Sequence, residues 1–457
     1  MSEDLEYISL LSCPRCQGSL CPSGSAIICE TCGHACPIIA GIPWVFEHPE
    51  GQRLEWLTRY NLFIQSIEHE SAGIKEELRL AGLLPQTVER LRRLLQAKVE
   101  HAKAVAKLLA PLGKIGEGAL ETSLAAKVRL PENQSLMGYY ANVIRDWGWD
   151  TAENKACLEA LLAVIPRDLS PQNLVVFGAG ACRLPVDLHE TLRPRRTLAI
   201  DINPFLLMAA RKIIRGQTLN LYEFPIAPRD KSSVAIARKC LRAGGAVSPG
   251  FHLLLADGLN APLKAGSFDT ALTPWFVDIV PQDFREFALS VNRSLKVGGV
   301  WLNFGSLAFH HARPSLCYSR DEALAIVEGS GFEITKVCED SVPYLVSPDS
   351  CQTRHERVFT FSARKLRDLA APEKFSYLPL WLEDHSLKVP KSQAFDRLIL
   401  VNRTYADIVS QVDGQRSITD VAELIAPSIG LSVEAARGVI AALLTNIYET
   451  TLRGNQF

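Results

Sequence analysis

Apolar residues recur at helical spacing in one part of the chain. The positions are Val88, Leu91, Leu95, Ala102, Val105 and Leu109. Residues three, four and seven apart share one face of a helix, so this stripe predicts an amphipathic helix. Arg92 and Lys98 sit off the stripe, which favours a solvated charged face over a binding patch.

From about residue 131 the pattern changes to short, nearly continuous apolar runs. They lie at 174–177, 198–200, 252–255 and 268–278, and a further run follows a Gly-Gly turn near 300. Runs of this length with little polar interruption are typical of parallel strands that are buried on both faces. Their alternation with helix-length segments predicts an α/β, doubly wound, Rossmann-like domain.

Composition divides the chain into five regions. We expect a cysteine-rich domain over 1–48, a helical segment over 49–130 and the α/β domain over 131–366. A proline-containing stretch without a clear period, 367–392, is predicted to be a linker. Residues 393–457 form a small C-terminal domain.

Charge and hydropathy limit the partners. The 457 residues carry a net charge of −1, which gives no general attraction to nucleic acid or membrane surfaces. The acidic N-terminus does not have the form of a signal peptide, and no apolar run is long enough to span a bilayer. We therefore expect a cytoplasmic protein that acts without a membrane or nucleic-acid partner.

Four cysteines form two C-x-x-C pairs, Cys13 with Cys16 and Cys29 with Cys32. Two such pairs predict a closed tetrahedral site for structural zinc, whose binding would supply much of the folding energy of so small a segment. The alternative is four unrelated buried cysteines, which the spacing disfavours. Cys36 is expected to pack as a small apolar residue.

The run at 174–177 ends in Gly178 and Gly180, and the next run ends in Asp201. Glycines let the backbone approach a ligand closely, and an acid at the end of the second strand accepts hydrogen bonds from ribose hydroxyls. Asp257 follows the third run and is placed to hold an adenine amino group. A dinucleotide fold is the alternative, but the third glycine of G-x-G-x-x-G is absent.

Several stretches resemble known methyltransferases. LKVGGVW (295–301) is similar to the turn before the reversed terminal hairpin of class I S-adenosylmethionine-dependent methyltransferases. Four others, in the right order over about 131–366, resemble the carnosine N-methyltransferase-like family: YYANVIRDWGWD, TPWFVDIV, GGVWLNFGSLAFHH and SPDSCQTRHERVFTFSARK.

This resemblance implies roles for particular residues. Asn142 and Arg145 match positions that contact the methionine end of the cofactor, and a guanidinium pairs well with a carboxylate. Gly178, Gly180, Asp201 and Asp257 complete the cofactor site. Asp278 and His310 match positions that grip the imidazole of carnosine.

An imidazole nitrogen must be neutral to attack a methyl group. A carboxylate that accepts the other nitrogen's N–H fixes the tautomer and stabilises the developing charge, a role that suits Asp278. His310 is expected to orient the substrate or relay a proton. Structural alternatives stay open: Asp278 as a helix N-cap, His310 as a hydrogen-bonded structural histidine, and Arg145 paired with Asp146 on a helix surface.

One position departs from the family. A tyrosine of its closing strand, which lies in the substrate pocket, is replaced by Glu356. An acid-lined pocket prefers a cationic or hydrogen-bond-donating substrate. Carnosine itself is therefore not the expected substrate.

Both ends of the chain carry further resemblances. Residues 11–46 resemble the zinc-ribbon family that activates tRNA, protein and rRNA methyltransferases. Residues 394–449 resemble the small peptide-binding chaperone domain of pyrroloquinoline quinone biosynthesis, with Ser417 or Thr419 as a helix cap. The resemblance implies a peptide partner at this domain, and a winged-helix-like packing module is the alternative.

Together these features predict a zinc-containing, S-adenosylmethionine-dependent N-methyltransferase that acts on an imidazole or similar nitrogen of a small molecule or peptide. The alternatives are an O- or C-methyltransferase on another metabolite, a nucleic-acid methyltransferase, and a non-catalytic scaffold that keeps the cofactor fold.

Overall fold

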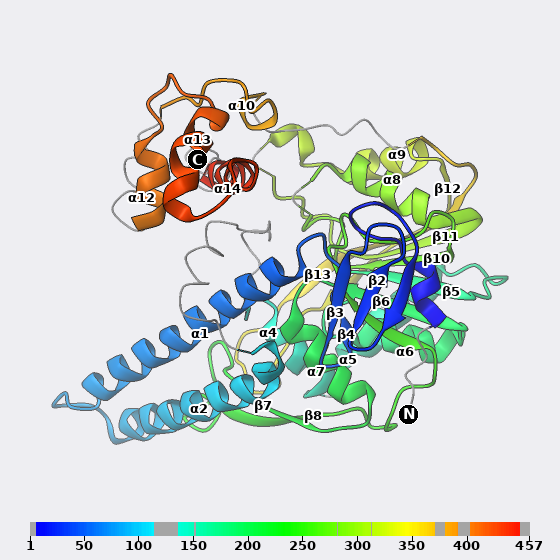
Figure 1. The fold of residues 1–457 in the computed structure, drawn as a ribbon. Helices are drawn as coiled ribbons and strands as arrows, with labels where there is room; N and C mark the ends of the chain where they lie inside the picture. The colour runs from blue at the N-terminus through cyan, green and yellow to red at the C-terminus, as the bar shows by residue number, and fades with distance from the viewer. Residues whose placement is uncertain are drawn as a thin grey trace. The chain divides into compact units, whose positions relative to one another are not determined.

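A seven-stranded sheet lies at the centre of the α/β part of the chain, in the order β12-β13-β11-β10-β5-β6-β9 (Figure 1). Strands β11, β10, β5, β6 and β9 are parallel to one another, and β13 is antiparallel to both of its neighbours. The strands are β5 (Asn173–Phe177), β6 (Arg196–Asp201), β9 (Phe251–Leu255), β10 (Phe268–Pro274), β11 (Leu295–Gly305), β12 (Phe332–Pro343) and β13 (His355–Lys365). This order, with its reversed terminal hairpin, confirms the predicted fold class.

The computed structural model describes residues 6–113, 136–149, 152–280, 282–311, 313–370, 380–391 and 403–447. The chain divides into two compact units. The first comprises Met1–Pro49, Tyr60–Gly113 and Ser135–Ala371, and the second comprises Glu50–Arg59, Lys114–Gln134 and Pro372–Phe457. Each unit is described by itself.

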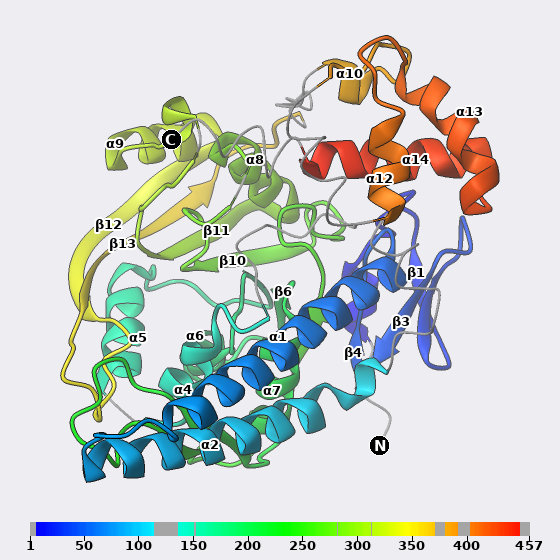
Figure 2. The same cartoon turned by 90° about the vertical axis from the view of Figure 1, so that its left-hand side faces the viewer.

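Helices cover both faces of the sheet (Figure 2). One face carries α5 (Ala152–Val164), α6 (Arg183–Leu192) and α7 (Pro204–Ile214), and the other carries α8 (Phe284–Ser294) and α9 (Arg320–Gly329). The second face is densely aromatic, and the side chains of Phe177, Phe287, Trp301 and Phe361 are at most 1% exposed. Their burial stabilises the sheet that positions the site.

A hairpin and a helix flank the sheet near α4 (Tyr140–Trp147). The predicted amphipathic helix is α2 (Pro85–Leu109), and it follows the long helix α1 (Pro49–Glu77). Buried His101 of α2 packs edge-on against Tyr140 of α4, with ring centroids 4.9 Å apart. The Tyr140 hydroxyl donates to the backbone carbonyl of Tyr222 in the hairpin of β7 (Leu219–Glu223) and β8 (Ile236–Cys240). These contacts fix the start of α4.

The N-terminal region is a small antiparallel sheet that docks on the edge of the large one. It contains a short 3-10 helix (Glu6–Leu10), β1 (Leu20–Ser23), β2 (Ala26–Cys29), β3 (Ala35–Ile39) and β4 (Ile42–Pro43). Just beyond β4, Trp44 forms a parallel bridge with Leu255 of β9, and the Val45 N–H donates to the Leu255 carbonyl at 2.9 Å. The docked region thus covers backbone groups that an edge strand would otherwise expose.

The same region fills a gap in the helical layer. The connection from β9 to β10 is fully described and holds no helix. Tyr7, Ile8 and Leu11 are at most 4% exposed and belong to the same apolar core as α8. The Ser12 N–H donates to the Pro262 carbonyl at 2.9 Å. The cysteine-rich region therefore docks in cis and replaces a covering helix.

The second unit is mainly helical over its described residues, which include residues 50–59 of α1 and an isolated antiparallel bridge between Lys388 and Ser417. Its elements are α10 (Leu380–Glu383), α12 (Arg403–Ser410), α13 (Ile418–Ile429) and α14 (Val433–Ile447). Ser417 caps α13 in a reciprocal capping box with Asp420, so the cap is Ser417 and not the alternative Thr419. Val401 and Asn402, at the start of the predicted C-terminal domain, lie outside the described residues.

Within the described ranges, no single helix is both long and apolar enough to cross a bilayer, whereas α13 and α14 meet those limits only as a pair bent by 110°.

The docking of the N-terminal region generates a prediction. Leu11→Ala should lower the free energy of unfolding by about 2–5 kcal/mol, because it leaves a cavity in a shared core. Denaturant unfolding of the full chain measures this change. Leu62→Ala is the control, because Leu62 is 59% exposed. Equal stability of the two variants would show that the N-terminal region is not part of the cooperative core.

Candidate active site

The candidate site lies at the carboxyl ends of four neighbouring parallel strands. Gly178 follows β5, Asp201 ends β6, Asp257 follows β9 and Asp278 lies shortly after β10. Ligands of open α/β sheets bind at this edge. The strand order therefore brings together side chains that are up to 100 residues apart.

The glycine turn after β5 is shaped for close approach. Gly178 and Gly180 have φ values of 69° and 57°, which other residues rarely adopt. A Cβ on Gly178 would lie 2.2 Å from the Phe276 ring, whereas a Cβ on Gly180 would meet nothing within 4 Å. The space beside Gly180 suits a ligand. Buried Cys182 also has a left-handed φ, 67°, at the N-cap of α6.

Asp201 is buried and held by backbone donors. Its two carboxylate oxygens accept the N–H of Gly180 at 2.7 Å and of Asn203 at 2.8 Å. Burial raises the pKa of Asp201 to about 6, although these hydrogen bonds oppose the shift. The carboxylate keeps lone pairs for ribose hydroxyls.

Asp257 is half-buried on the neighbouring strand end. It accepts the Leu259 N–H at 2.9 Å and an Asn260 amide hydrogen at 3.0 Å. Burial raises the pKa of Asp257, and the two hydrogen bonds oppose this shift. Its position next to Asp201 agrees with a role at the far end of the same ligand.

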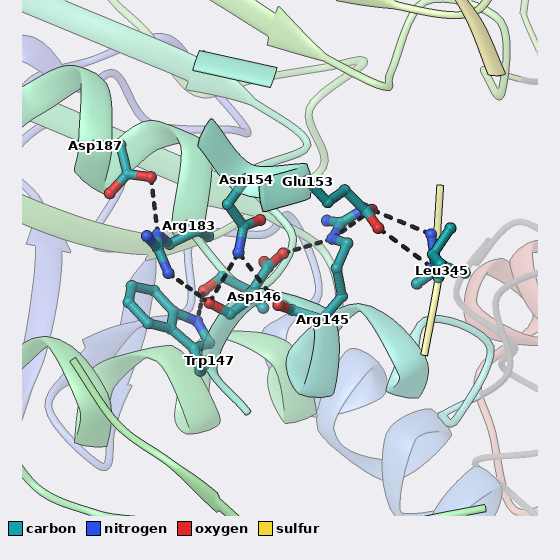
Figure 3. Close-up of polar contacts among 10 residues, drawn as sticks. Arg145, Asp146, Trp147, Glu153, Asn154, Arg183, Asp187 and Leu345 are labelled. Atoms are coloured by element: carbon teal, nitrogen blue, oxygen red, sulfur yellow. Dashed lines mark hydrogen bonds and ion pairs between the residues drawn. The ribbon is translucent and has the colours of Figure 1, made fainter. Parts of the chain in front are cut away.

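Arg145 of α4 lies beside Asp146 and Glu153 and keeps one buried donor unpaired within the described part of the chain (Figure 3). Its Nε lies 2.7 Å from Asp146 Oδ1 and 3.7 Å from Glu153 Oε1, while its buried Nη1 has no hydrogen-bond partner among the described residues. Burial lowers the pKa of Arg145, but these carboxylates outweigh that effect and raise it overall. A buried cation with a spare donor suits a ligand carboxylate. Half-buried Asn142 lies one turn earlier on α4.

The Arg145–Asp146 pair was the structural alternative, and the structure does contain it. However, Asp146 is 3% exposed, so the pair is buried rather than at a helix surface. Asn154 of α5 and Arg183 of α6 both donate to the Asp146 backbone carbonyl (Figure 3). The pair orients Arg145 and does not consume all of its donors.

Asp278 is 6% exposed and does not cap a helix. The residue that caps the following helix, α8, is Asp283. Asp278 Oδ2 accepts the Ser306 hydroxyl at 2.6 Å and the Ala308 N–H at 2.9 Å. Burial raises the pKa of Asp278, with the charge of Glu356 as a smaller contribution in the same direction. Through these hydrogen bonds Asp278 holds the loop that follows β11.

His310 and Glu356 are less enclosed. His310 is exposed, and no hydrogen bond joins its ring to Asp278 among the described residues. Glu356, on β13, is half-buried and forms an ion pair with exposed Arg354. The structure thus places Glu356 close enough to Asp278 to affect its charge and leaves the His310 side chain exposed to solvent.

Three aromatic residues near the candidate site, Tyr139, Trp275 and Tyr344, were not predicted from the sequence to contact a ligand. Burial raises the pKa of Tyr139, and the nearby groups of Asp201, Tyr344 and Asp278 raise it further. Tyr139 therefore lies near both Asp201 and Asp278. The sequence feature that could have identified Tyr139 is its position in the YYANVIRDWGWD stretch, which resembles the carnosine N-methyltransferase-like family.

The Tyr344 and Trp275 rings pack with centroids 4.9 Å apart. Trp275 has a left-handed φ of 50°, a strained conformation of the kind found at functional sites. Its partner Tyr344 comes from a distant loop, and no local pattern in the sequence signals that pairing.

The four cysteines of the N-terminal region also converge. The Sγ atoms of Cys13, Cys16, Cys29 and Cys32 all lie within 4.8 Å of one another. Four thiolates at this spacing are a donor set suited to a tetrahedral metal such as zinc. Cys36 is fully buried beside them, as expected of an apolar packing residue.

The strand order and the glycine–acid arrangement define a class I, Rossmann-like S-adenosylmethionine-dependent methyltransferase fold. A profile of the carnosine N-methyltransferase family matches residues 129–367, more than half of the chain. The chain therefore belongs to the carnosine N-methyltransferase family.

Individual relatives are more distant. A carnosine N-methyltransferase of Dictyostelium discoideum is 39% identical over 58 residues, which are 13% of this chain and 12% of that protein. The chain thus matches about an eighth of that relative's length.

Two solved structures show lower identity over longer stretches. An S-adenosylmethionine dependent methyltransferase of Mesorhizobium loti is 17% identical, with a TM-score of 0.32, over 46% of this chain and 100% of that one. A chain from the complex of the Haloferax volcanii Trm112 methyltransferase activator with a methyltransferase is 14% identical, with a TM-score of 0.33, over 50% and 96% of the two chains. The fold assignment rests on the strand order and the family, not on these scores.

The elevated pKa of Asp201 predicts pH-dependent cofactor binding. Only the ionised carboxylate is a pure acceptor for ribose hydroxyls, so affinity for S-adenosylhomocysteine should rise as pH increases through about 6 and level off above it. At pH 5 binding should be about tenfold weaker than at pH 7.5. Calorimetric titration measures this.

Asp201→Asn should remove that pH dependence, whereas the control Asp168→Asn should keep it, because Asp168 is 75% exposed. A wild-type affinity that is constant from pH 5 to 7.5 would contradict the assignment of Asp201.

The contribution of Asp201 to the stability of the ligand-free fold should change with pH in the opposite direction to its contribution to binding. A folded-state pKa above the unfolded value means that the native state binds more protons, so the contribution of Asp201 to stability falls as pH rises from about 4 to 6.

Proposed function

We propose that this protein is an S-adenosylmethionine-dependent N-methyltransferase acting on an imidazole or similar nitrogen of a small molecule or peptide. The observation that carries the proposal is the buried Asp278 carboxylate, which lies at the same strand edge as the cofactor-side acid Asp201. Membership of the carnosine N-methyltransferase family supports the same reaction class.

S-adenosylmethionine, when bound, supplies a methyl group already activated on a sulfonium. In this proposal Arg145 holds its carboxylate through the free Nη1, and Asn142 contacts the same end. Asp201 receives the ribose hydroxyls, Asp257 the adenine amino group, and the Gly178–Gly180 turn admits the ligand. The chain contributes position and charge rather than a covalent intermediate.

Asp278 is the proposed acceptor for the substrate. Both of its hydrogen bonds from the loop after β11 reach Oδ2, so we assign Oδ1 to a substrate N–H. This bond would hold the imidazole in the tautomer whose other nitrogen carries the lone pair for attack. The carboxylate would also stabilise the positive charge that develops on the ring.

His310 and Glu356 complete the proposed substrate side. His310 would reach the substrate from the rim, because its ring is exposed. Glu356 replaces the family's tyrosine with an acid, and its pairing with Arg354 offers both signs of charge. This arrangement favours a substrate that carries a cationic or hydrogen-bond-donating group, such as a histidine-containing peptide.

The remaining sequence predictions belong to the same proposal. We assign structural zinc to the four N-terminal cysteines, because a closed four-thiolate site leaves no open position for a substrate. The small C-terminal domain is proposed to bind a peptide or to serve as a packing module. A cytoplasmic location also stays a prediction.

Methyl transfer from labelled S-adenosylmethionine tests the reaction. Carnosine, anserine, histidine and histidine-containing peptides form the panel. Product on an imidazole should fall by about 10²–10³-fold in Asp278→Asn, because the variant loses the charge that opposes the developing cation. Binding of S-adenosylhomocysteine should remain. His310→Ala should also reduce transfer.

Asp168→Asn serves as the control, because Asp168 is 75% exposed and pairs with Arg364 away from the strand edge that holds Asp278. Full turnover on an imidazole by Asp278→Asn would refute the role of Asp278. Binding of the cofactor without transfer to any imidazole would favour an O- or C-methyltransferase.

Metal content tests the cysteine site. The purified protein should hold about one zinc per chain by elemental analysis. Cys13→Ser should lose the metal and unfold at a lower temperature, because zinc binding contributes folding energy. Cys21→Ser is the control, because Cys21 lies outside the four-thiolate cluster. Full zinc occupancy in Cys13→Ser would contradict the assignment.

A further inference from the structure

Glu153 is a buried acid on α5 that no sequence motif singles out. Its side chain is 2% exposed, and its Oε1 lies 3.7 Å from Arg145 Nε. The two carboxylate oxygens accept the N–H groups of Leu345 at 3.1 Å and Val346 at 3.3 Å. Figure 3 shows Glu153 between Arg145 and the backbone of Leu345. One carboxylate therefore bridges the proposed cofactor clamp and a distant loop.

That loop carries part of the substrate side. Tyr344 precedes Leu345 and packs on Trp275, and the Arg354 guanidinium lies 5.0 Å from the Tyr344 ring centroid. Arg354 in turn pairs with Glu356. A shift of the backbone at Leu345 would therefore move the aromatic wall and its charged pair together.

The backbone conformation of Leu345 needs contacts that stabilise it. Its φ of 52° is left-handed, a conformation that costs an apolar side chain free energy unless the surroundings hold it. Glu153 is the side chain that accepts its N–H. Burial raises the pKa of Glu153, whereas Arg145 and the two N–H groups oppose that shift. The charge of Glu153 and the shape of the loop thus depend on Arg145.

Residues 347–351 of the same loop are held by contacts that do not involve Glu153. The Cys351 N–H donates to the Ala227 carbonyl at 2.8 Å, and the Arg229 N–H donates to the Asp349 carbonyl at 3.1 Å. The Ser347 hydroxyl bonds to buried Glu223 of β7. The Tyr344 N–H also donates to the Arg354 carbonyl at 3.0 Å. Leu345 and Val346 are therefore the loop residues whose backbone N–H groups depend on Glu153.

We propose that Glu153 is a positioning residue that couples occupancy of the cofactor's carboxylate site to the order of Leu345 and Val346. The inference rests on the proposed role of Arg145 in binding that carboxylate. A ligand carboxylate on Nη1 fixes the guanidinium, which fixes Glu153 and, through it, the two N–H groups. Coupling of this kind is reciprocal, so an ordered substrate wall also strengthens cofactor binding.

Hydrogen exchange of the full chain tests the coupling without a known substrate. S-adenosylhomocysteine carries the amino-acid end, whereas 5′-methylthioadenosine keeps the adenosine and lacks the carboxylate. At saturation, S-adenosylhomocysteine should slow exchange in peptides covering residues 340–350 by about fivefold or more. Methylthioadenosine should protect the glycine turn but not residues 340–350. Equal protection of residues 340–350 by both ligands overturns the proposal.

Glu153→Gln supplies the second test. It keeps the shape of the side chain and loses the charge that joins Arg145 to the loop. The variant should bind S-adenosylhomocysteine about fivefold more weakly, and residues 340–350 should no longer be protected at saturation. Glu159→Gln is the matched control on the same helix, because Glu159 is 63% exposed. Unchanged protection in a folded Glu153→Gln overturns the proposal.

The outcomes separate this inference from the proposed function. Absence of S-adenosylhomocysteine binding overturns both. Binding that leaves residues 340–350 unprotected overturns the coupling alone. Protection that depends on the carboxylate supports the coupling, even if no imidazole in the transfer panel is methylated. If Glu153→Gln does not fold, the comparison of the two ligands on the wild-type chain decides.

Discussion

Buried carboxylates held by backbone N–H groups are the feature on which the candidate site depends. Asp201 accepts from the glycine turn, Asp278 from the loop after β11, and Glu153 from the loop before β13. An ionised acid removed from water is costly unless donors or cations compensate. Because these donors belong to the backbone at strand ends, the acids are oriented before any ligand arrives. Burial also raises their pKa values, which makes the site sensitive to mild acid.

The N-terminal region contributes to that site through the sheet rather than by direct contact. It pairs with β9 beside Leu255, two residues before Asp257, and its apolar residues replace a helix between β9 and β10. An edge strand with an open layer beside it would be exposed to solvent and to unwanted pairing. The four-cysteine cluster lies in this covering region. The packing of the four-cysteine cluster and the stability of β9 are thus physically linked.

The proposed substrate side consists of segments that are remote in sequence. Trp275 directly follows β10, Tyr344 directly follows β12, and Tyr139 directly precedes α4. Aromatic faces next to acids suit a flat nitrogen base that gains positive charge. The Arg354–Glu356 pair adds a polar rim. This set of aromatic, acidic and basic side chains differs from a purely aromatic pocket. Family membership alone therefore does not define the substrate.

Local sequence was sufficient to predict the parallel strands, the glycine turn, α2, the cap at Ser417 and the two cysteine pairs. Strand burial, helical periodicity, turn conformation and metal-ligand spacing are all properties of short segments. It also placed Asp201, Asp257 and Asp278 at one edge, because parallel strands end together. Tertiary packing decided the rest. It buried the Arg145–Asp146 pair, exposed His310 and docked the cysteine-rich region on β9. It also joined Glu153 to residues almost 200 positions away, because such contacts arise only when helices and loops fold onto the same sheet.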